Sequence, residues 1–327
     1  MTDPPRTRLA GFPTPLHALP RFGAAIGAEV WIKRDDTGPV GLAGNKVRKL
    51  EYVLADATSR GADTIVIIGA EQSNAARATA AACAQLGLRC VLVLSGDEPA
   101  GPPTGNLLLD ELFGAELHFA GAAGWEELRE VSERLTDDLR AQGATPYLLP
   151  AGASSAVGAC GFVQAWHELQ DQLGADAHTL FHAASSGGTQ AGLLVGRAIS
   201  GEGPELRAIG VAPDLKPDVD ALARGAAELV GADIDIPPAQ IDMSFVGDGY
   251  GIPTPEANEA IRLLARTEGI VCDPVYSGKA LAALVAAQHE GPAVFWHTGG
   301  YHALFAPRYG AAVSTITGMR RPPVRSW

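Results

Sequence analysis

The sequence lacks the features by which nucleic-acid-binding and membrane proteins are usually recognised. With 25 Lys+Arg against 37 Asp+Glu its formal charge is −12, and no basic cluster is present to attract a phosphate backbone. No apolar run approaches the ~20 residues of a membrane span, and the first ten residues hold no apolar segment typical of a signal peptide. We therefore expect no nucleic-acid partner, no membrane partner and a cytoplasmic location.

Cysteine is also scarce. The 4 cysteines are scattered without a pair at two-residue spacing, so neither a redox pair nor a zinc site is expected. His297 and His302 lie five positions apart and lack a third ligand nearby, so we predict no metal ion. Hydrophobic residues make up 46% of the 327, enough for one large domain or two ordinary ones. A folded globular protein is expected.

What the sequence does contain is a repeated alternation of short β-branched runs and stretches of helical spacing. This alternation is typical of α/β proteins in which helices cover a largely parallel sheet. The predicted strands are residues 64–68, 90–94, 116–120, 146–149, 179–183, 207–211 and 293–297. No internal repeat or low-complexity linker marks a boundary, so any division into two domains has to be discontinuous or subtle.

The first of three glycine-rich turns, Gly-Leu-Ala-Gly-Asn-Lys at residues 41–46, presents a lysine at the start of a helix. There, exposed N–H groups and the helix dipole disfavour the charged form of Lys46. A neutral amine can attack an aldehyde, and lysine is rare in this chain. Position alone also leaves open a solvated surface lysine.

The second turn consists of Ser185, Ser186, Gly187, Gly188 and Thr189, between a predicted strand and a helix rich in small residues. Two glycines flanked by hydroxyls at a helix N-terminus form a cup for phosphate. We expect backbone N–H groups to hold the phosphate, with arginine and lysine playing little part because none lies within the loop. A plain turn is the alternative, since the pattern is neither a dinucleotide fingerprint nor a P-loop.

Two further strand ends carry polar residues. The third turn, at 297–300, follows the 293–297 strand and should lie at the carboxyl edge of the sheet, where such sheets bind ligands. Ser73 and Asn74 end another strand and begin a helix, where a substrate carboxylate can meet backbone N–H groups. Ser73 can instead serve only as a helix N-cap, although capping and binding are compatible.

Five motifs in register resemble the family of 1-aminocyclopropane-1-carboxylate deaminase and D-cysteine desulfhydrase. They are Gly44-Asn45-Lys46-Val47-Arg48-Lys49-Leu50-Glu51, Gln72-Ser73-Asn74, Ser186-Gly187-Gly188-Thr189, Asp273-Pro274-Val275-Tyr276 and His297-Thr298-Gly299-Gly300. The resemblance implies a pyridoxal 5′-phosphate enzyme of fold type II, tryptophan synthase β-like and usually a homodimer. It also implies two three-layer α/β domains with mostly parallel sheets, the smaller one (49–161) inserted in a large cofactor-binding domain (1–48 and 162–327).

The resemblance further implies how the cofactor is held. Lys46, rather than Lys49, carries pyridoxal phosphate covalently as an imine. The glycine-rich turn at 186–189 holds the phosphate group. Asn74 lies by the oxygen of the cofactor ring.

For the substrate, a small amino acid, the resemblance implies three further contacts. Ser73 contacts the substrate carboxylate or assists proton transfer. Two tyrosines of the family's site match Tyr250 and Tyr276, and each can act as an acid, a base or a contact.

Two positions divide the family. Its deaminases carry Glu after the Val-Tyr pair and Leu inside the His-x-Gly-Gly turn, whereas its desulfhydrases carry hydroxyl residues at both, and this chain has Ser277 and Thr298. A carboxylate beside the pyridine nitrogen keeps it protonated, whereas a hydroxyl leaves a weaker electron sink. Opening a cyclopropane needs the stronger sink, but expelling a thiolate, sulfite or chloride needs only loss of the Cα proton. We therefore predict β-elimination, with Ser277 and Thr298 at the cofactor.

Three residues depart from the family pattern: Ala70 and Glu71 replace Gly-Val, and Ala75 replaces His. They predict a pocket for a larger or differently charged β-substituent than that of cysteine. The default prediction is a D-cysteine desulfhydrase-like lyase that gives pyruvate, ammonia and the released β-group. The alternatives are deamination of 1-aminocyclopropane-1-carboxylate, β-replacement in a biosynthetic pathway, and a non-catalytic ligand-binding relative. The sequence does not specify the enantiomer or the leaving group.

Overall fold

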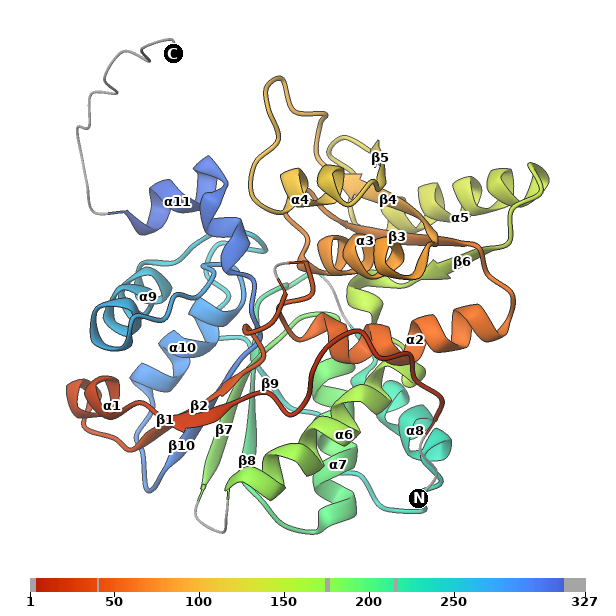
Figure 1. Ribbon diagram of the computed structural model, residues 1–327. Coiled ribbons are helices and arrows are strands. Elements are labelled where there is room, and N and C mark those ends of the chain that lie inside the picture. Colours follow the sequence, from red (N-terminus) through yellow and green to blue (C-terminus); the bar gives the residue numbers. More distant parts are fainter. Residues whose placement is uncertain (1–3, 40, 174–176, 215–216, 315–327) are drawn as a thin grey trace, which may run out of the picture.

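The computed structural model describes residues 4–39, 41–173, 177–214 and 217–314, which fold around two separate β-sheets (Figure 1). The larger sheet contains, in spatial order, β1 (Leu16–Ala18), β2 (Val30–Arg34), β10 (Ala293–His297), β7 (Thr179–Ala184), β8 (Glu205–Gly210) and β9 (Ile241–Asp242). The smaller sheet contains β5 (Glu116–Phe119), β4 (Arg89–Ser95), β3 (Thr64–Ala70) and β6 (Pro146–Leu149). Each sheet is the centre of one of the two lobes in Figure 1.

The strand pairings are parallel except for the antiparallel pair of β1 and β2. All five residues of β10 are buried, and they are mostly apolar, as expected for a strand whose sheet is covered on both faces. The sequence predictions at 146–149 and 293–297 coincide with β6 and β10. The strand β2 was not predicted, because Lys33 and Arg34 interrupt its apolar pattern.

The helices connect the strands, as the alternating pattern indicates. They are α1 (Pro20–Ile26), α2 (Lys46–Ser59), α3 (Asn74–Leu86), α4 (Asn106–Leu112), α5 (Trp125–Ala141), α6 (Ala156–Leu173), α7 (Gly188–Ser200), α8 (Val219–Leu229), α9 (Pro255–Glu268), α10 (Ser277–Ala286) and α11 (Pro307–Val313), with short 3₁₀ turns η1 (Ala151–Ala153) and η2 (Tyr301–Phe305).

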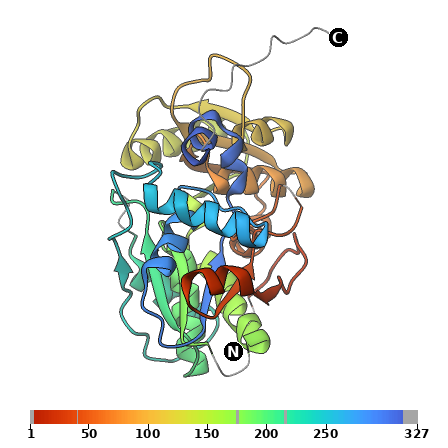
Figure 2. The same cartoon turned by 90° about the vertical axis from the view of Figure 1, so that its left-hand side faces the viewer.

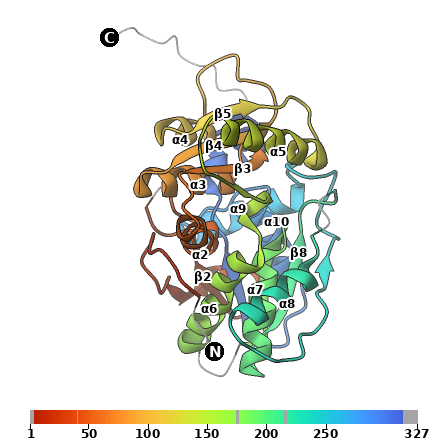
Figure 3. The ribbon, with the colours of Figure 1, turned by 90° about the vertical axis from the view of Figure 1, so that its right-hand side faces the viewer.

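Helices cover both faces of the larger sheet, because successive side chains of its strands point to opposite faces. On β10, Val294 and Trp296 pack with Phe162 of α6, whereas Phe295 packs with Leu281 of α10. The helices α1, α9 and α10 lie in front in Figure 2, and α6, α7 and α8 lie on the side that faces the viewer in Figure 3. The larger lobe is therefore a three-layer α/β unit.

The smaller sheet follows the same rule. Val66 and Ile68 of β3 pack with Leu128 of α5, while Ile65 and Ile67 pack into the core beneath α2 and α3. Two three-layer α/β units with mostly parallel sheets result, as the sequence predicts. This is the architecture that the family resemblance implies.

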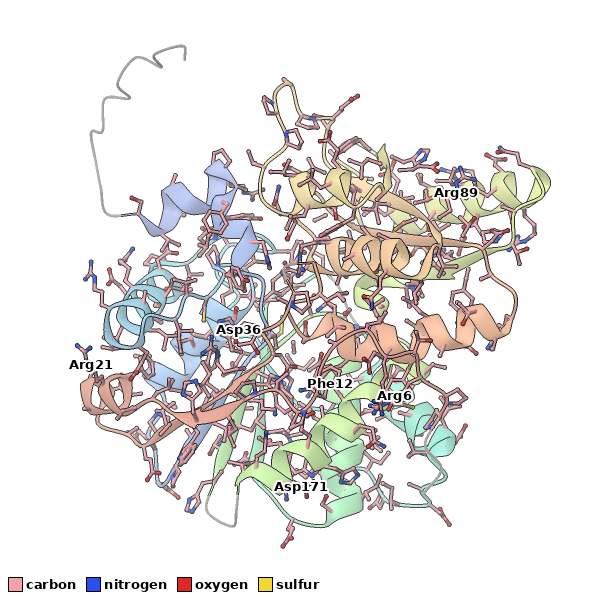
Figure 4. The ribbon with its side chains drawn as sticks, viewed as in Figure 1. Arg6, Phe12, Arg21, Asp36, Arg89 and Asp171 are labelled. Atoms are coloured by element: carbon pink, nitrogen blue, oxygen red, sulfur yellow. The ribbon has the colours of Figure 1, made fainter. Side chains whose placement is uncertain are left out.

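A buried ionic network fixes the start of α2 to the larger lobe. The guanidinium of Arg48 lies 2.8 Å from carboxylate oxygens of Asp35, after β2, and of Glu168, on α6. It also lies 4.3 Å above the ring of Phe12, which Figure 4 places near α2, between the lobes. These contacts of the buried guanidinium with two carboxylates and an aromatic ring fix the position of α2 against the larger lobe.

The predicted domain boundaries remain a prediction. All strands of the smaller sheet fall within residues 49–161, but the proposed cuts at 48/49 and 161/162 fall inside α2 and α6. These two helices pack against each other, and α2 also contacts α3. The part of the larger domain after residue 314 lies outside the described residues. Among the helices that the structure describes, none has the length and apolar character needed to cross a membrane.

Candidate active site

A polar cavity lies where the carboxyl ends of β7 and β10 meet the start of α2. We call it the inner cavity, and its lining is Asn45, Lys46, Lys49, Asn74, Ala183, Ala184, Ser185, Ser186, Gly187, Thr189, Gln190, Tyr276, Thr298 and Gly299. The end of β3 opens beside it onto a second space, the adjoining pocket. That pocket is lined by Lys46, Ile68, Gly69, Ser73, Asn74, Ala75, Trp125, Ala151, Gly152, Ser185, Ser186, Tyr250 and Tyr276.

Lys46 is shared by the two spaces and begins α2. Burial lowers the pKa of its amine from 10.5 to about 8, with nearby Asp273 opposing the shift and Arg77 adding to it. The Lys46 Nζ donates to Asn45 Oδ1 at 3.0 Å, and Asn45 Nδ2 donates to Thr189 Oγ1 at 3.1 Å. A substantial fraction of the amine is therefore neutral near pH 8, and Asn45 ties it to the glycine-rich turn.

The glycine-rich turn ends β7 and begins α7. Gly187 has φ +83°, a left-handed conformation that favours glycine, and it serves as the N-cap residue of α7. A Cβ added to Gly188 would lie 2.8 Å from Ser154 Oγ and 3.1 Å from Lys49 Nζ, so a larger residue would displace these two side chains. The first N–H of α7, that of Gly188, donates to Ser154 Oγ at 3.2 Å, while Gly187, Thr189 and Gln190 line the cavity at the positive end of the helix dipole, which favours a phosphate.

Lys49 lies against this turn, which the sequence analysis did not foresee. Its Nζ donates to Ser154 Oγ at 2.8 Å, and that oxygen lies 2.7 Å from Ser186 Oγ. Burial, and next the charge of Lys46, hold the pKa of Lys49 well below its usual value. The expectation that arginine and lysine play little part in holding the phosphate stays a prediction, although α2 brings Lys49 to the turn from outside the loop. The spacing of Lys46 and Lys49, which places both on one helix face, was the available signal.

Ser73 and Asn74 form the opposite wall. Ser73 is the N-cap of α3, its Oγ accepting from Ala76 N at 3.2 Å, and it also lines the adjoining pocket. The N-cap role is therefore confirmed, and contact with a substrate carboxylate stays a prediction that this position allows. Asn74 Oδ1 accepts from Asn106 Nδ2 at 2.9 Å, which fixes the direction of its amide.

Tyr250 and Tyr276 meet across the adjoining pocket, with their hydroxyl groups hydrogen-bonded to each other and their ring centroids 6.0 Å apart. Burial raises the pKa of Tyr250 to about 12 and that of Tyr276 well above its usual value. Both phenols therefore keep their protons at neutral pH.

The two residues that divide the family differ in position. Thr298 lines the inner cavity, but Ser277 is fully buried at the start of α10. The Ser277 hydroxyl donates to the carboxylate of Asp273, which also accepts the backbone N–H of Tyr276 at 2.7 Å. The structure therefore presents Thr298 to the cavity, while Ser277 holds the turn that carries Tyr276.

Of the catalytic and cofactor residues predicted from the sequence, Gly188 and Ser277 are the two that are not part of either lining, and Ala70 and Glu71, predicted to shape the substrate pocket, also line neither space. Trp125 and Ala151 line the adjoining pocket without having been selected, since no motif marks them. His297 has a structural role, because its Nδ1 accepts from Gly299 N at 3.1 Å and its Nε2 lies 2.9 Å from Val271 O.

Comparisons with known proteins agree with this geometry. The chain matches the family described as "Pyridoxal-phosphate dependent enzyme" over residues 7–299. It is 40% identical to a putative 1-aminocyclopropane-1-carboxylate deaminase of Pyrococcus horikoshii, over 92% of this chain and 93% of that one. It is also 40% identical to D-cysteine desulfhydrase of Klebsiella pneumoniae, over 94% and 97%. The crystal structure of an ACC deaminase homologue superposes with a TM-score of 0.87 at 38% identity, covering 95% of each chain.

Proposed function

Because this chain belongs to the family of pyridoxal-phosphate-dependent enzymes, and within it to the group of 1-aminocyclopropane-1-carboxylate deaminases and D-cysteine desulfhydrases, we propose that it eliminates a β-substituent from a small amino acid. With D-cysteine, Cα would lose a proton and the Cβ–S bond would break with its electron pair on sulfur. Water then converts the remaining unsaturated amine to pyruvate and ammonia.

The residues of the inner cavity fit the cofactor. The positive end of the α7 dipole, the hydroxyl of Ser186 and the amine of Lys49 suit a phosphate dianion, and Lys46 would bind the aldehyde. When bound, pyridoxal phosphate supplies an electron-accepting ring that stabilises negative charge at the substrate Cα.

The remaining residues have roles in binding and proton transfer. The Lys46 amine, whose pKa is lowered to about 8 by burial, is suited to move the Cα proton. The N-terminus of α3 at Ser73 suits the substrate carboxylate. Tyr250 and Tyr276 keep their protons, so they can donate one to the departing β-group.

One observation carries the choice of elimination over ring opening. Among the described residues, neither the inner cavity nor the adjoining pocket has an Asp or Glu in its lining. The cofactor ring nitrogen would therefore meet the hydroxyl of Thr298 rather than a carboxylate, which leaves a weaker electron sink. This favours expulsion of a good β-leaving group over opening of a cyclopropane.

The test is a substrate panel with the purified holoenzyme. We expect pyruvate and ammonia from D-cysteine or another β-substituted amino acid, offered in both D and L forms, and almost no 2-oxobutanoate from 1-aminocyclopropane-1-carboxylate. Efficient formation of 2-oxobutanoate would favour the deaminase alternative. Transfer of an added nucleophile to the β-carbon would favour β-replacement.

We also propose, on the family resemblance, a cytoplasmic homodimer with an inserted small domain at residues 49–161. Light scattering of the full chain tests the homodimer, and a monomer would contradict it. Limited proteolysis followed by mass spectrometry tests the domain boundaries.

A further inference from the structure

Three spaces meet at one side chain, that of Trp125. The adjoining pocket, of about 30 Å³, has Trp125 in its wall. Trp125 also lines a larger cleft of about 970 Å³, the outer cleft, which reaches Glu71, Tyr250 and Arg308. It lines a third space as well, a groove of about 610 Å³ that we call the side groove, which runs past Ser154 and Ser186 toward Leu222. Among the described residues, Trp125 alone lines all three spaces, while Tyr250 also borders the outer cleft and Ile68, Ala151 and Ser186 also border the side groove.

The position of Trp125 is well defined. It is the first residue of α5 and is half-buried, packing against the core of the smaller lobe that contains Ile68 and Leu128. Its ring meets that of Tyr250, from the larger lobe, edge-on with centroids 5.6 Å apart. An aromatic contact of this kind contributes about 0.5–1.5 kcal/mol beyond area burial. Trp125 thus joins the two lobes across the pocket.

Ala75 lies in the wall of the same adjoining pocket. It is the second residue of α3 and only 4% exposed, and its side chain is a single methyl group. Among the described residues, the lining of this pocket holds no cationic side chain beyond the reactive Lys46. A β-substituent there meets small and aromatic residues, so burying a sulfonate or carboxylate would leave its charge unpaired. This argues against the larger or differently charged substituent that the sequence predicts.

We propose that Trp125 is the specificity-determining residue of this enzyme: it forms the far wall of the substrate side-chain pocket and limits it to small, uncharged β-substituents such as a thiol or chloride. The proposal rests on the proposed function, because it assigns a side-chain pocket to that reaction. Removing the indole joins the pocket to the outer cleft and the side groove, and larger substituents then fit.

The first experiment compares Trp125→Ala with the wild type on D-cysteine and S-benzyl-D-cysteine, with the L forms alongside. We expect the ratio of kcat/KM for the benzyl substrate to that for cysteine to rise at least tenfold, mostly through KM. The same ratio for Trp125→Phe should lie between those of the wild type and Trp125→Ala. Trp31→Ala is the matched control, because Trp31 lies at the start of β2, away from the carboxyl edge of the sheet, and should leave the ratio unchanged.

A second variant tests whether Trp125 shares its space with residue 75. Ala75→His should lower activity on D-cysteine in the wild-type background, because the imidazole and the indole compete for one small pocket. The same change should recover much of that loss in Trp125→Ala, where the space is open. A loss of equal size in both backgrounds would contradict the proposed shared pocket.

A binding measurement separates this proposal from the proposed reaction. Alanine and homophenylalanine carry no β-leaving group, so their dissociation constants can be read from the cofactor absorbance near about 410–430 nm without turnover. The ratio of the dissociation constant of alanine to that of homophenylalanine should be at least tenfold higher for Trp125→Ala than for the wild type. If no substrate is eliminated but this shift occurs, the proposed function fails and the size limit stands. If the absorbance band is intact and the ratio does not change, the role of Trp125 is overturned.

Discussion

The two halves of the site are built in different ways. The cofactor half is assembled from α2 and the start of α7, and its polar groups already have partners: Lys49 on Ser154, and Asn45 on both Lys46 and Thr189. The substrate half brings single side chains from separate elements, such as Trp125 from α5 and Tyr250 from a loop of the larger lobe, and it opens onto large clefts.

The difference follows from what each half has to do. A cofactor that stays bound is held best by a rigid site, in which buried hydrogen bonds fix the polar groups before the cofactor binds. A substrate that enters and leaves needs an opening, so its wall is made of half-buried side chains at a seam between lobes. Mutations in the cofactor half should therefore abolish cofactor binding or folding. Mutations in the substrate half should change which substrate is accepted.

The sharpest test of the cofactor half is Lys46→Ala. We expect loss of turnover and of the covalent bond to the cofactor, because Lys49 donates to Ser154 and is not placed to replace the amine. Borohydride reduction of the wild type followed by mass spectrometry should place the label on Lys46. Added methylamine should restore partial activity to the variant. A label on Lys49 would show that the roles of the two lysines are reversed.

A second test concerns stability, through the network beneath α2. Replacing Arg48 with Met leaves the buried Asp35 without its cation, while Glu168 keeps its ion pair with Lys33, and the loss should cost about 3 kcal/mol or more of unfolding free energy. The matched control is Arg60→Met, later on the same helix, whose exposed pair with Asp56 is screened by solvent and should change stability little. Urea unfolding measures both. Equal effects would mean that the network does not anchor the helix.

Lys49→Met asks whether the phosphate depends on a cation as well as on backbone N–H groups. We expect the dissociation constant of pyridoxal phosphate to rise about tenfold or more, which corresponds to ~1.4 kcal/mol per decade. A phosphate dianion would favour the charged form of Lys49 that burial and Lys46 disfavour, and the variant would lose the resulting charge-assisted hydrogen bond. Lys49→Arg should keep part of the affinity. An unchanged constant would mean that the turn alone binds the phosphate, as the sequence first suggested.

The two halves were also unequally predictable. The cofactor half lies in contiguous motifs, so strand ends and helix starts marked Lys46 and the turn from Ser186 to Thr189 as candidates, and the family resemblance then assigned them to the cofactor. Lys49 was missed because a short-range pattern does not say which helix face is buried. Trp125 carries no motif, and only tertiary packing brings it to Tyr250. Ser277 has the residue type that the resemblance requires, but its hydroxyl is turned to Asp273.

The pH dependence of cofactor loading tests the electrostatics of Lys46. Its pKa is lowered to about 8, so the folded apoenzyme holds fewer protons at this residue than the unfolded chain between about pH 8 and the ordinary value of 10.5. Stability from this group therefore rises with pH across that window and is lowest below it. The rate of imine formation with added pyridoxal phosphate should rise to a plateau, with a midpoint near pH 8. A midpoint above pH 10 would mean that burial does not shift the amine.

The smallest expected effect comes from Glu71, at the mouth of the substrate half. Its carboxylate is exposed in the outer cleft, together with Glu126, Glu127, Asp214 and Asp248, and Arg308 is the one basic side chain among the described residues of that lining. This charge should repel an anionic substituent such as the sulfonate of cysteate before it reaches Trp125.

Glu71→Gln removes the charge and keeps the shape, so kcat/KM for D- or L-cysteate should rise about two- to fivefold relative to cysteine, the range expected for exposed charges. High salt should abolish the difference, because exposed charges are screened within about 10 Å at 0.1 M ionic strength and less at higher salt. A change in this ratio that persists in high salt would point instead to a direct contact of Glu71 with the substrate. No change at low salt would mean that the lining of the adjoining pocket alone determines which substituent is accepted.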